Sequence, residues 1–202
     1  NWRYSSQPEP GTADRNIPIP RGKMTGGSSS INGMVYVRGQ PLDYDTWAQH
    51  GNKGWGWSEV SRIFNKMENY KNSKNDYRGK SGPLKISKLA DENPLYNALL
   101  KSAKSLGYPI NDDYNGPNQE GIAKIQATIL NGRRMSADYC YLKPALKRSN
   151  LKIITGAMTE KLIINDDQCS GVIYKKNNQI FKVMCNKEVI LSAGAIASPL
   201  IL

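Results

Sequence analysis

The chain has 202 residues, of which 39% are hydrophobic and 22% charged, as in an ordinary globular protein rather than a disordered or fibrous one. No apolar stretch approaches the roughly 20 residues that a membrane-spanning helix requires. The net charge of +11 raises the question of nucleic-acid binding, but the 28 basic residues are spread along the chain without an RNP or zinc-finger pattern, which favours a solvated basic surface.

The first third of the chain predicts loops and one amphipathic helix. Residues 1–21 hold four prolines and are expected to be extended or looped. A turn is expected at residues 51–56. Ser58 then predicts a helix N-cap, because apolar residues follow at the i, i+3, i+4, i+7 spacing, namely Val60, Ile63, Phe64 and Met67. The polar residues 71–82 predict a surface loop.

The middle third predicts a second helix with clear ends. Asn93 is placed to cap it, Pro94 suits its first position, and Gly107 is expected to stop it. One apolar stripe runs along it, made of Leu95, Ala98, Leu99, Ala103 and Leu106. Residues 108–134 combine turns with a short β-like run over 123–130, and Ser136 predicts the cap of a helix that reaches Leu146.

The last third predicts strands. Four β-branched runs cover residues 151–155, 161–165, 171–175 and 180–184, and Asn177-Asn178 predicts the turn of a hairpin. A further apolar strand is expected at residues 188–192, followed by Ala193-Gly194-Ala195 and a new helix at Ser198-Pro199. This β-turn-α order is typical of a parallel sheet covered on both faces, where small residues serve either packing or the approach of a ligand.

The stretch GKMTGGSSSINGMVYVRG, residues 22–39, is the most informative segment. Paired glycines and three hydroxyls can present N–H and O–H donors to a phosphate or a polar ring edge. The segment is neither a Walker A loop nor a G-x-G-x-x-G turn, and Lys23 precedes the glycines instead of following them. From its composition alone, a linker or simple turn remains an alternative to a ligand cradle.

The remaining chemistry-bearing residues are sparse. Cys140, Cys169 and Cys185 form no C-x-x-C pair, which fits a reducing compartment and predicts neither a disulfide framework nor a metal site. The only histidine, His50, is expected at the surface. The chain opens at Asn1 without a targeting signal and closes inside an apolar run, so we interpret it as the middle piece of a longer protein.

Several segments together resemble the glucose–methanol–choline (GMC) flavin oxidoreductases. GKMTGGSSSINGMVYVRGQPLDYD resembles the first signature of this family, and SAGAIASPLIL resembles the opening of the second. DYDTWAQHGNKGWGW, GPNQEGI, NGRRMSADYCYLKPA and NKEVILSAG also look like family segments, in the family's order. The resemblance covers essentially the whole chain and is closest in look to the choline dehydrogenase and acceptor-linked alcohol dehydrogenase branch.

The resemblance implies an α/β fold of mixed α+β character, with part of a Rossmann-like FAD-binding domain and part of a substrate domain. Residues 1–81 are expected to hold the FAD cradle with the GGSSS loop, and residues 82–148 to be part of the substrate domain. Residues 149–202 are expected to be a strand-rich return to the FAD-binding domain.

The resemblance also implies the residues that contact FAD. They are Ser28, Asn32, Gly33, Met34, Val35, Thr159, Ala193 and Gly194, each with a packing or turn role as the alternative. Ile31 stands where some members carry a histidine joined to flavin, so non-covalent FAD is expected. Thr25 departs from the usual aliphatic residue. No counterpart of the family's G-x-G-x-x-G fingerprint or catalytic histidine is present, so no catalytic residue is predicted and the fragment is expected to be inactive alone.

The implied reaction is oxidation of the CH–OH group of a choline-like or other primary alcohol, with hydride transfer to flavin. The implied partners are the alcohol and an electron acceptor, a quinone or another carrier, without nucleic acid. Contact with a membrane surface is possible, and the expected location is cytoplasmic or peripheral to an inner membrane. The alternatives are a basic nucleic-acid-binding domain and a non-catalytic remnant that acts as an interaction module.

Overall fold

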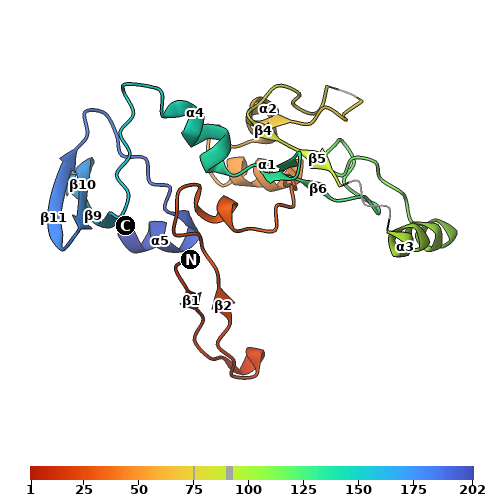
Figure 1. The fold of residues 1–202 in the computed structure, drawn as a ribbon, viewed down its shortest axis with the longest axis horizontal. Coiled ribbons are helices and arrows are strands. Elements are labelled where there is room, and N and C mark those ends of the chain that lie inside the picture. Colours follow the sequence, from red (N-terminus) through yellow and green to blue (C-terminus); the bar gives the residue numbers. More distant parts are fainter. Residues whose placement is uncertain (75, 90–92) are drawn as a thin grey trace. The chain divides into compact units, whose positions relative to one another are not determined.

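A computed structural model describes residues 1–74, 76–89 and 93–202. The chain forms two compact units, Asn1–Arg148 and Ser149–Leu202. Both units contain helices and strands, which confirms the mixed α/β class (Figure 1). Within the described ranges, no helix has both the length and the apolar character needed to cross a membrane.

The first unit consists of short strands and helices joined by long loops. Its strand pairs are β1 (Tyr4–Ser5) with β2 (Pro18–Ile19), β3 (Glu68–Asn69) with β4 (Leu84–Lys85), β5 (Ser87–Lys88) with β6 (Gln126–Ala127), and β7 (Ile129–Leu130) with β8 (Arg133–Arg134). Its helices are α1 (Pro41–Gln49), α2 (Trp57–Met67), α3 (Pro94–Ser105) and α4 (Lys143–Ala145), and 3-10 turns lie at Pro10–Thr12 and Gly27–Ser30.

Helix α1 was not predicted, although its start carries a recognisable signal. Pro41 takes the first helical position, and a capping box joins Gln40 to Asp43, whose Oδ2 accepts the Gln40 N–H at 2.8 Å. The predicted helix over residues 58–67 is confirmed as α2, but the Ser58 cap is wrong. The N-cap is Gly56, two residues earlier, because Asp45 Oδ1 from α1 accepts the Trp57 N–H at 2.8 Å.

The ends of α3 are confirmed as predicted. The Asn93 side chain accepts the Leu95 N–H at 2.9 Å, and Gly107 has a φ of 81°, the left-handed conformation of a helix stop. The apolar stripe is only partly buried. Ala103 is buried, whereas Leu95 and Leu106 are 80% and 74% exposed.

The loop predicted for residues 71–82 consists of turns around an isolated bridge between Lys80 and Asn69, and residue 75 lies outside the described residues. The β-like run over 123–130 is reduced to β6 and β7. The helix predicted after Ser136 is confirmed. It opens with a π-helical turn, Asp138–Leu142, and Ser136 Oγ accepts the Tyr139 N–H at 3.3 Å.

The second unit contains an antiparallel sheet in the order β11–β10–β9 (Figure 1). The strands are β9 (Met158–Asn165), β10 (Gln168–Lys176) and β11 (Gln179–Met184). The predicted hairpin is confirmed, since Asn177 and Asn178 have φ angles of 50° and 62°, as a type I′ turn requires. Tyr174 stacks on Phe181 across it, with ring centroids 5.3 Å apart.

Three predictions for this unit are wrong. Residues 151–155 and 188–192 form no strand, because neither segment pairs with a neighbour among the described residues. The last helix does not start at Ser198-Pro199. It runs as α5 from Gly194 to Ile201 and carries Pro199 in its interior.

Candidate functional site

The loop that opens with Gly22 is folded back on itself rather than extended as a linker. A Cβ on Gly22 would lie 2.2 Å from the Gly27 carbonyl oxygen, so no other residue fits this close backbone approach. Gly26 and Gly27 have φ angles of 81° and 53°, which favour glycine. The 3-10 turn of residues 27–30 follows directly.

Ser28 helps to close this loop. Its hydroxyl oxygen accepts the Gly22 N–H at 3.1 Å, and its carbonyl accepts the Asn32 N–H at 2.9 Å. The turn role that the sequence left open for Ser28 is therefore present in the structure. A contact between Ser28 and a cofactor phosphate stays a prediction.

The turn from Asn32 to Val35 presents unused backbone donors. Met34 has a φ of 63°, a strained value for a residue other than glycine, and its N–H is held by Asn32 Oδ1 at 3.2 Å. A Cβ built on Gly33 meets no atom within 4 Å, and Val35 is 54% exposed. Among the residues that the structure describes, the N–H groups of Gly33 and Val35 have no acceptor.

Arg134, which was not among the predicted site residues, holds this turn in place. Its Nη1 donates to the Asn32 carbonyl and to Asn32 Oδ1, both at 2.7 Å, and lies 3.3 Å from the Ser29 carbonyl. The Ala137 N–H also donates to Ser29 Oγ, at 2.9 Å. The signal available in the sequence was the NGRRMSADYC segment, but its contact with residues about a hundred positions earlier is tertiary.

A polar network fixes the backbone that follows the turn. The Tyr36 carbonyl accepts hydrogen bonds from Tyr114 Oη and Asn115 Nδ2, both at 3.0 Å. Asn115 Oδ1 in turn accepts the Arg38 N–H at 2.6 Å, and the Gln126 carbonyl accepts the Tyr36 N–H at 2.8 Å. The exposed turn is therefore anchored at its C-terminal end by buried groups.

A cluster of buried charges lies beneath this network. Glu68 is fully buried and accepts a bidentate pair of hydrogen bonds from Arg78, at 2.8 and 2.9 Å, and a further bond from the Gly79 N–H at 2.7 Å. Arg38, 2% exposed, also donates to Glu68. Arg78 additionally pairs with Asp113. Because each buried charge has an opposite partner, the cluster can exist in the core.

Tyr36 lies against this cluster. Its hydroxyl is buried and has no hydrogen-bond partner among the described residues. Burial, and secondarily the negative charge of Glu68, raise the pKa of Tyr36 from 10.0 to about 12. The folded chain therefore keeps the Tyr36 proton to a higher pH than an exposed tyrosine would.

The other predicted contacts lie in the second unit. Thr159 is in β9 opposite Tyr174, beside an irregularity in the strand register. Ala193 precedes α5 and Gly194 begins it, with a φ of 90°. They belong to the second unit and the Asn32 turn to the first, so their part in a common site stays a prediction.

Of the other residues considered in the sequence, His50 lies outside this loop, whereas Ile31 lies in it. His50 is exposed at the end of α1. Ile31 is 38% exposed directly before the Asn32 turn. In the ranges 1–74, 76–89 and 93–202, no group of three or more His, Cys, Asp or Glu side chains is placed to hold a metal ion.

Comparison with known proteins supports the resemblance. The chain is 44% identical over its 202 residues to the oxygen-dependent choline dehydrogenase of Rhizobium johnstonii, of which it spans 37%. Pyridoxine 4-oxidase from Mesorbium loti matches with a TM-score of 0.91 and 33% identity, over 99% of this chain and 40% of that chain. An FAD-dependent oxidoreductase from Chaetomium thermophilum matches with a TM-score of 0.90 and 28% identity, over 98% of this chain and 37% of that chain.

The family profile of the GMC oxidoreductases matches residues 10–202, nearly the whole chain. The two signatures that carry the resemblance, at residues 22–45 and 192–202, both lie inside the matched range. The chain therefore belongs to the GMC oxidoreductase family.

Proposed function

We propose that this chain forms part of the FAD cradle of an oxidoreductase that acts on the CH–OH group of an alcohol. The observation that carries the proposal is the Asn32–Val35 turn, which presents the unused N–H groups of Gly33 and Val35 on a rigidly held backbone. The names of the relatives support this reading, since they include a choline dehydrogenase and an FAD-dependent oxidoreductase.

The residues present suit a flavin. The ring edge of FAD offers oxygen and nitrogen acceptors, which match the two free N–H groups, and Gly33 leaves space for close approach. The folded glycine-serine loop beside them suits the pyrophosphate. Ile31 has no nucleophilic atom, so FAD at this position is held non-covalently. FAD, when bound, supplies the site that accepts the hydride from the alcohol carbon.

The chain's own residues bind and orient in this proposal. Arg134 and the Tyr114–Asn115–Gln126 network keep the backbone donors in place without rearrangement, as preorganised binding requires. No residue of this chain is assigned as the catalytic base. Residues 1–81 and 149–202 are assigned to the FAD-binding domain and residues 82–148 to the substrate domain.

A choline-like or other primary alcohol is the proposed substrate. The electron acceptor is proposed to be oxygen, a quinone or another carrier, and the name of the choline dehydrogenase relative favours oxygen. Proposed contact with an anionic membrane surface rests on the net charge of +11 alone, and the proposed cytoplasmic or peripheral location rests on the cysteine pattern. Family membership supports the enzyme over a nucleic-acid-binding domain or an interaction module.

Gly33→Val in the complete protein tests the proposal. Inside the chain, a Cβ at Gly33 meets open space and the backbone needs no left-handed φ, so the fold should tolerate valine. A flavin that approaches Gly33 should be displaced. We expect the purified variant to keep its unfolding temperature but lose most of its flavin absorbance.

Gly11→Val is the matched control. Gly11 also meets no atom within 4 Å and has no left-handed φ, but it lies in the 3-10 turn between β1 and β2. This variant should keep its full flavin content. The proposal is wrong if the wild-type protein carries no flavin, or if Gly33→Val binds flavin as well as Gly11→Val does.

A further inference from the structure

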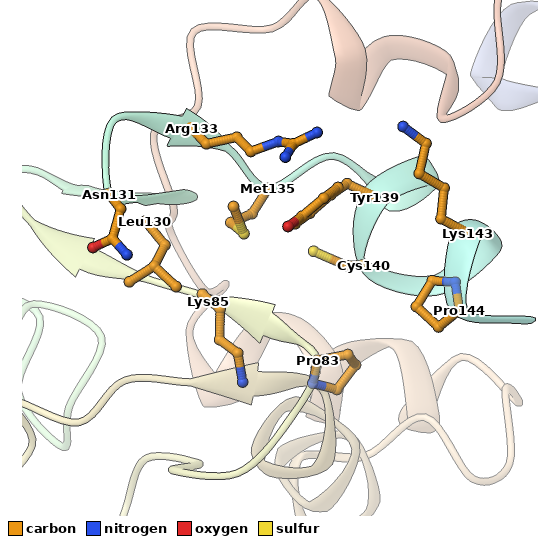
Figure 2. A pocket seen from close by; sticks show the side chains of 10 residues that line it. All are labelled: Pro83, Lys85, Leu130, Asn131, Arg133, Met135, Tyr139, Cys140, Lys143 and Pro144. Carbon is orange, nitrogen blue, oxygen red and sulfur yellow. The ribbon is translucent and has the colours of Figure 1, made fainter.

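The β8 segment, whose Arg134 holds the Asn32 turn, also borders a separate cavity of about 600 Å³ (Figure 2). The cavity lies entirely in the first unit, between the β4 and β8 strands and the helical turn that starts at Asp138. Its volume is in the range of small-molecule sites. Arg133 lines the cavity, whereas its neighbour Arg134 holds the Asn32 turn, so the two arginines belong to different sites.

Two cations gather at one side of the cavity. The Arg133 guanidinium stacks 4.0 Å from the centroid of the Tyr139 ring, and Lys143 Nζ lies 5.9 Å from the same centroid. Figure 2 shows both side chains reaching toward the space above this ring. No carboxylate lines the cavity among the residues that the structure describes. Asp138 lies nearby and pairs with Lys143, but at 3.5 Å, which leaves other donors of that ammonium group unused.

The third cation, Lys85, lies at the opposite side of the cavity. Its ammonium group donates to the Gly82 carbonyl at 3.0 Å, so it contributes mainly its aliphatic stem. The rest of the lining is largely apolar, with Met135 and Cys140 buried and Pro83 and Pro144 at the rim. The cavity therefore combines an apolar floor with a cationic side.

We propose that this cavity is a binding site for an organic carboxylate whose apolar body lies on Met135 and Cys140 and whose anionic group is held by Arg133 and Lys143. The guanidinium is held by its stacking on Tyr139, so it loses little freedom on binding a carboxylate. A carboxylate satisfies both cations at once, whereas a neutral amide of the same shape supplies no charge. The site is distinct from the cradle and does not depend on flavin binding there.

Calorimetric titration of the complete protein with 4-phenylbutyrate tests the proposal, with 4-phenylbutyramide as the matched neutral probe. We expect the carboxylate to bind about tenfold more tightly than the amide, with an affinity that falls as salt rises. Arg133→Gln and Lys143→Gln should each weaken carboxylate binding severalfold. Lys147→Gln, an exposed lysine just beyond α4 that does not line the cavity, should leave it unchanged.

The three cysteines allow the probe to be located. Burial raises the pKa of the Cys140 thiol, so its alkylation is slow, and a bound carboxylate should slow it further. Cys169 and Cys185 lie in the second unit and should react at unchanged rates. The proposal is overturned if the two probes bind equally or not at all, if Arg133→Gln and Lys143→Gln bind as the wild type does, or if Cys140 is not protected.

Discussion

Replacing Glu68 with glutamine should strongly destabilise the first unit. Glu68 is fully buried, and its carboxylate is the common partner of Arg38 and Arg78. Glutamine keeps the shape of the side chain but removes the negative charge. It also turns one hydrogen-bond acceptor into a donor that faces the guanidinium groups.

The size of the effect follows from what remains in the core. Arg38 and Arg78 are each 2% exposed, so neither can regain water without opening the structure. Arg78 keeps Asp113, but Arg38 loses its only carboxylate partner among the described residues. Breaking a buried pair by removing one partner typically costs about 3–5 kcal/mol. We expect a loss of unfolding free energy in that range.

Urea unfolding followed by tryptophan fluorescence is a suitable assay, because all four tryptophans of this chain lie in the first unit. Glu160→Gln removes an exposed carboxylate in β9 and should change the free energy of unfolding by at most about 0.5 kcal/mol. Adding Arg38→Met to Glu68→Gln should recover part of the loss, because it removes the unpaired charge. A Glu68→Gln variant as stable as Glu160→Gln would refute the reasoning.

Three further changes test other parts of the structure. Arg134→Met removes charged hydrogen bonds worth about 1.5–3 kcal/mol from the Asn32 turn, so flavin affinity should fall about tenfold or more. Arg134→Lys keeps a charged donor, so its flavin affinity should fall less. Fluorescence titration measures both affinities, and values equal to that of the wild type would show that Arg134 does not hold the turn. The pKa of Tyr36 is raised to about 12, so above pH 10 the unfolded chain loses this proton before the folded chain does. Between pH 10 and 12 the free energy of unfolding should therefore fall more steeply in the wild type than in Tyr36→Phe, by up to about 1.4 kcal/mol per pH unit. Urea unfolding at each pH measures this, and parallel pH profiles for the two proteins would exclude the contribution of Tyr36. Asn178 has a φ of 62°, which valine adopts poorly and glycine readily. Asn178→Val should therefore lower the unfolding temperature of the second unit, whereas Asn178→Gly should preserve or raise it. The reverse order would show that the turn does not set the stability of this unit.

Local signals in the sequence predicted the elements whose ends are set by neighbouring residues. Asn93 and Gly107 bound α3 through bonds and dihedral angles that depend only on nearby chain, and Asn177-Asn178 sets the hairpin in the same way. The predicted start of α2 was wrong because the first N–H of this helix is satisfied by Asp45, twelve residues earlier. The Gln40–Asp43 capping box is visible in the sequence, but no helix was predicted from it.

The predicted strands at residues 151–155 and 188–192 failed for a different reason. Their apolar runs match the pattern of interior strands in a parallel sheet, but a strand exists only through hydrogen bonds to a neighbour. Neither segment has one among the described residues, and Ile190 is 79% exposed. A hydrophobic pattern therefore predicts a preference for burial, whereas formation of a strand also depends on a neighbouring strand that supplies the hydrogen bonds.

The candidate cradle shows the same division between local and tertiary information. Gly26 and Gly27 could be recognised from the sequence because their left-handed conformations are properties of glycine. Arg134 could not, because nothing in its local pattern separates it from Arg133. The two side chains alternate along β8, so one reaches the Asn32 turn and the other the cavity. Because one short strand carries both residues, a change in the backbone of β8 should affect both places, whereas exchanging either side chain should affect only its own.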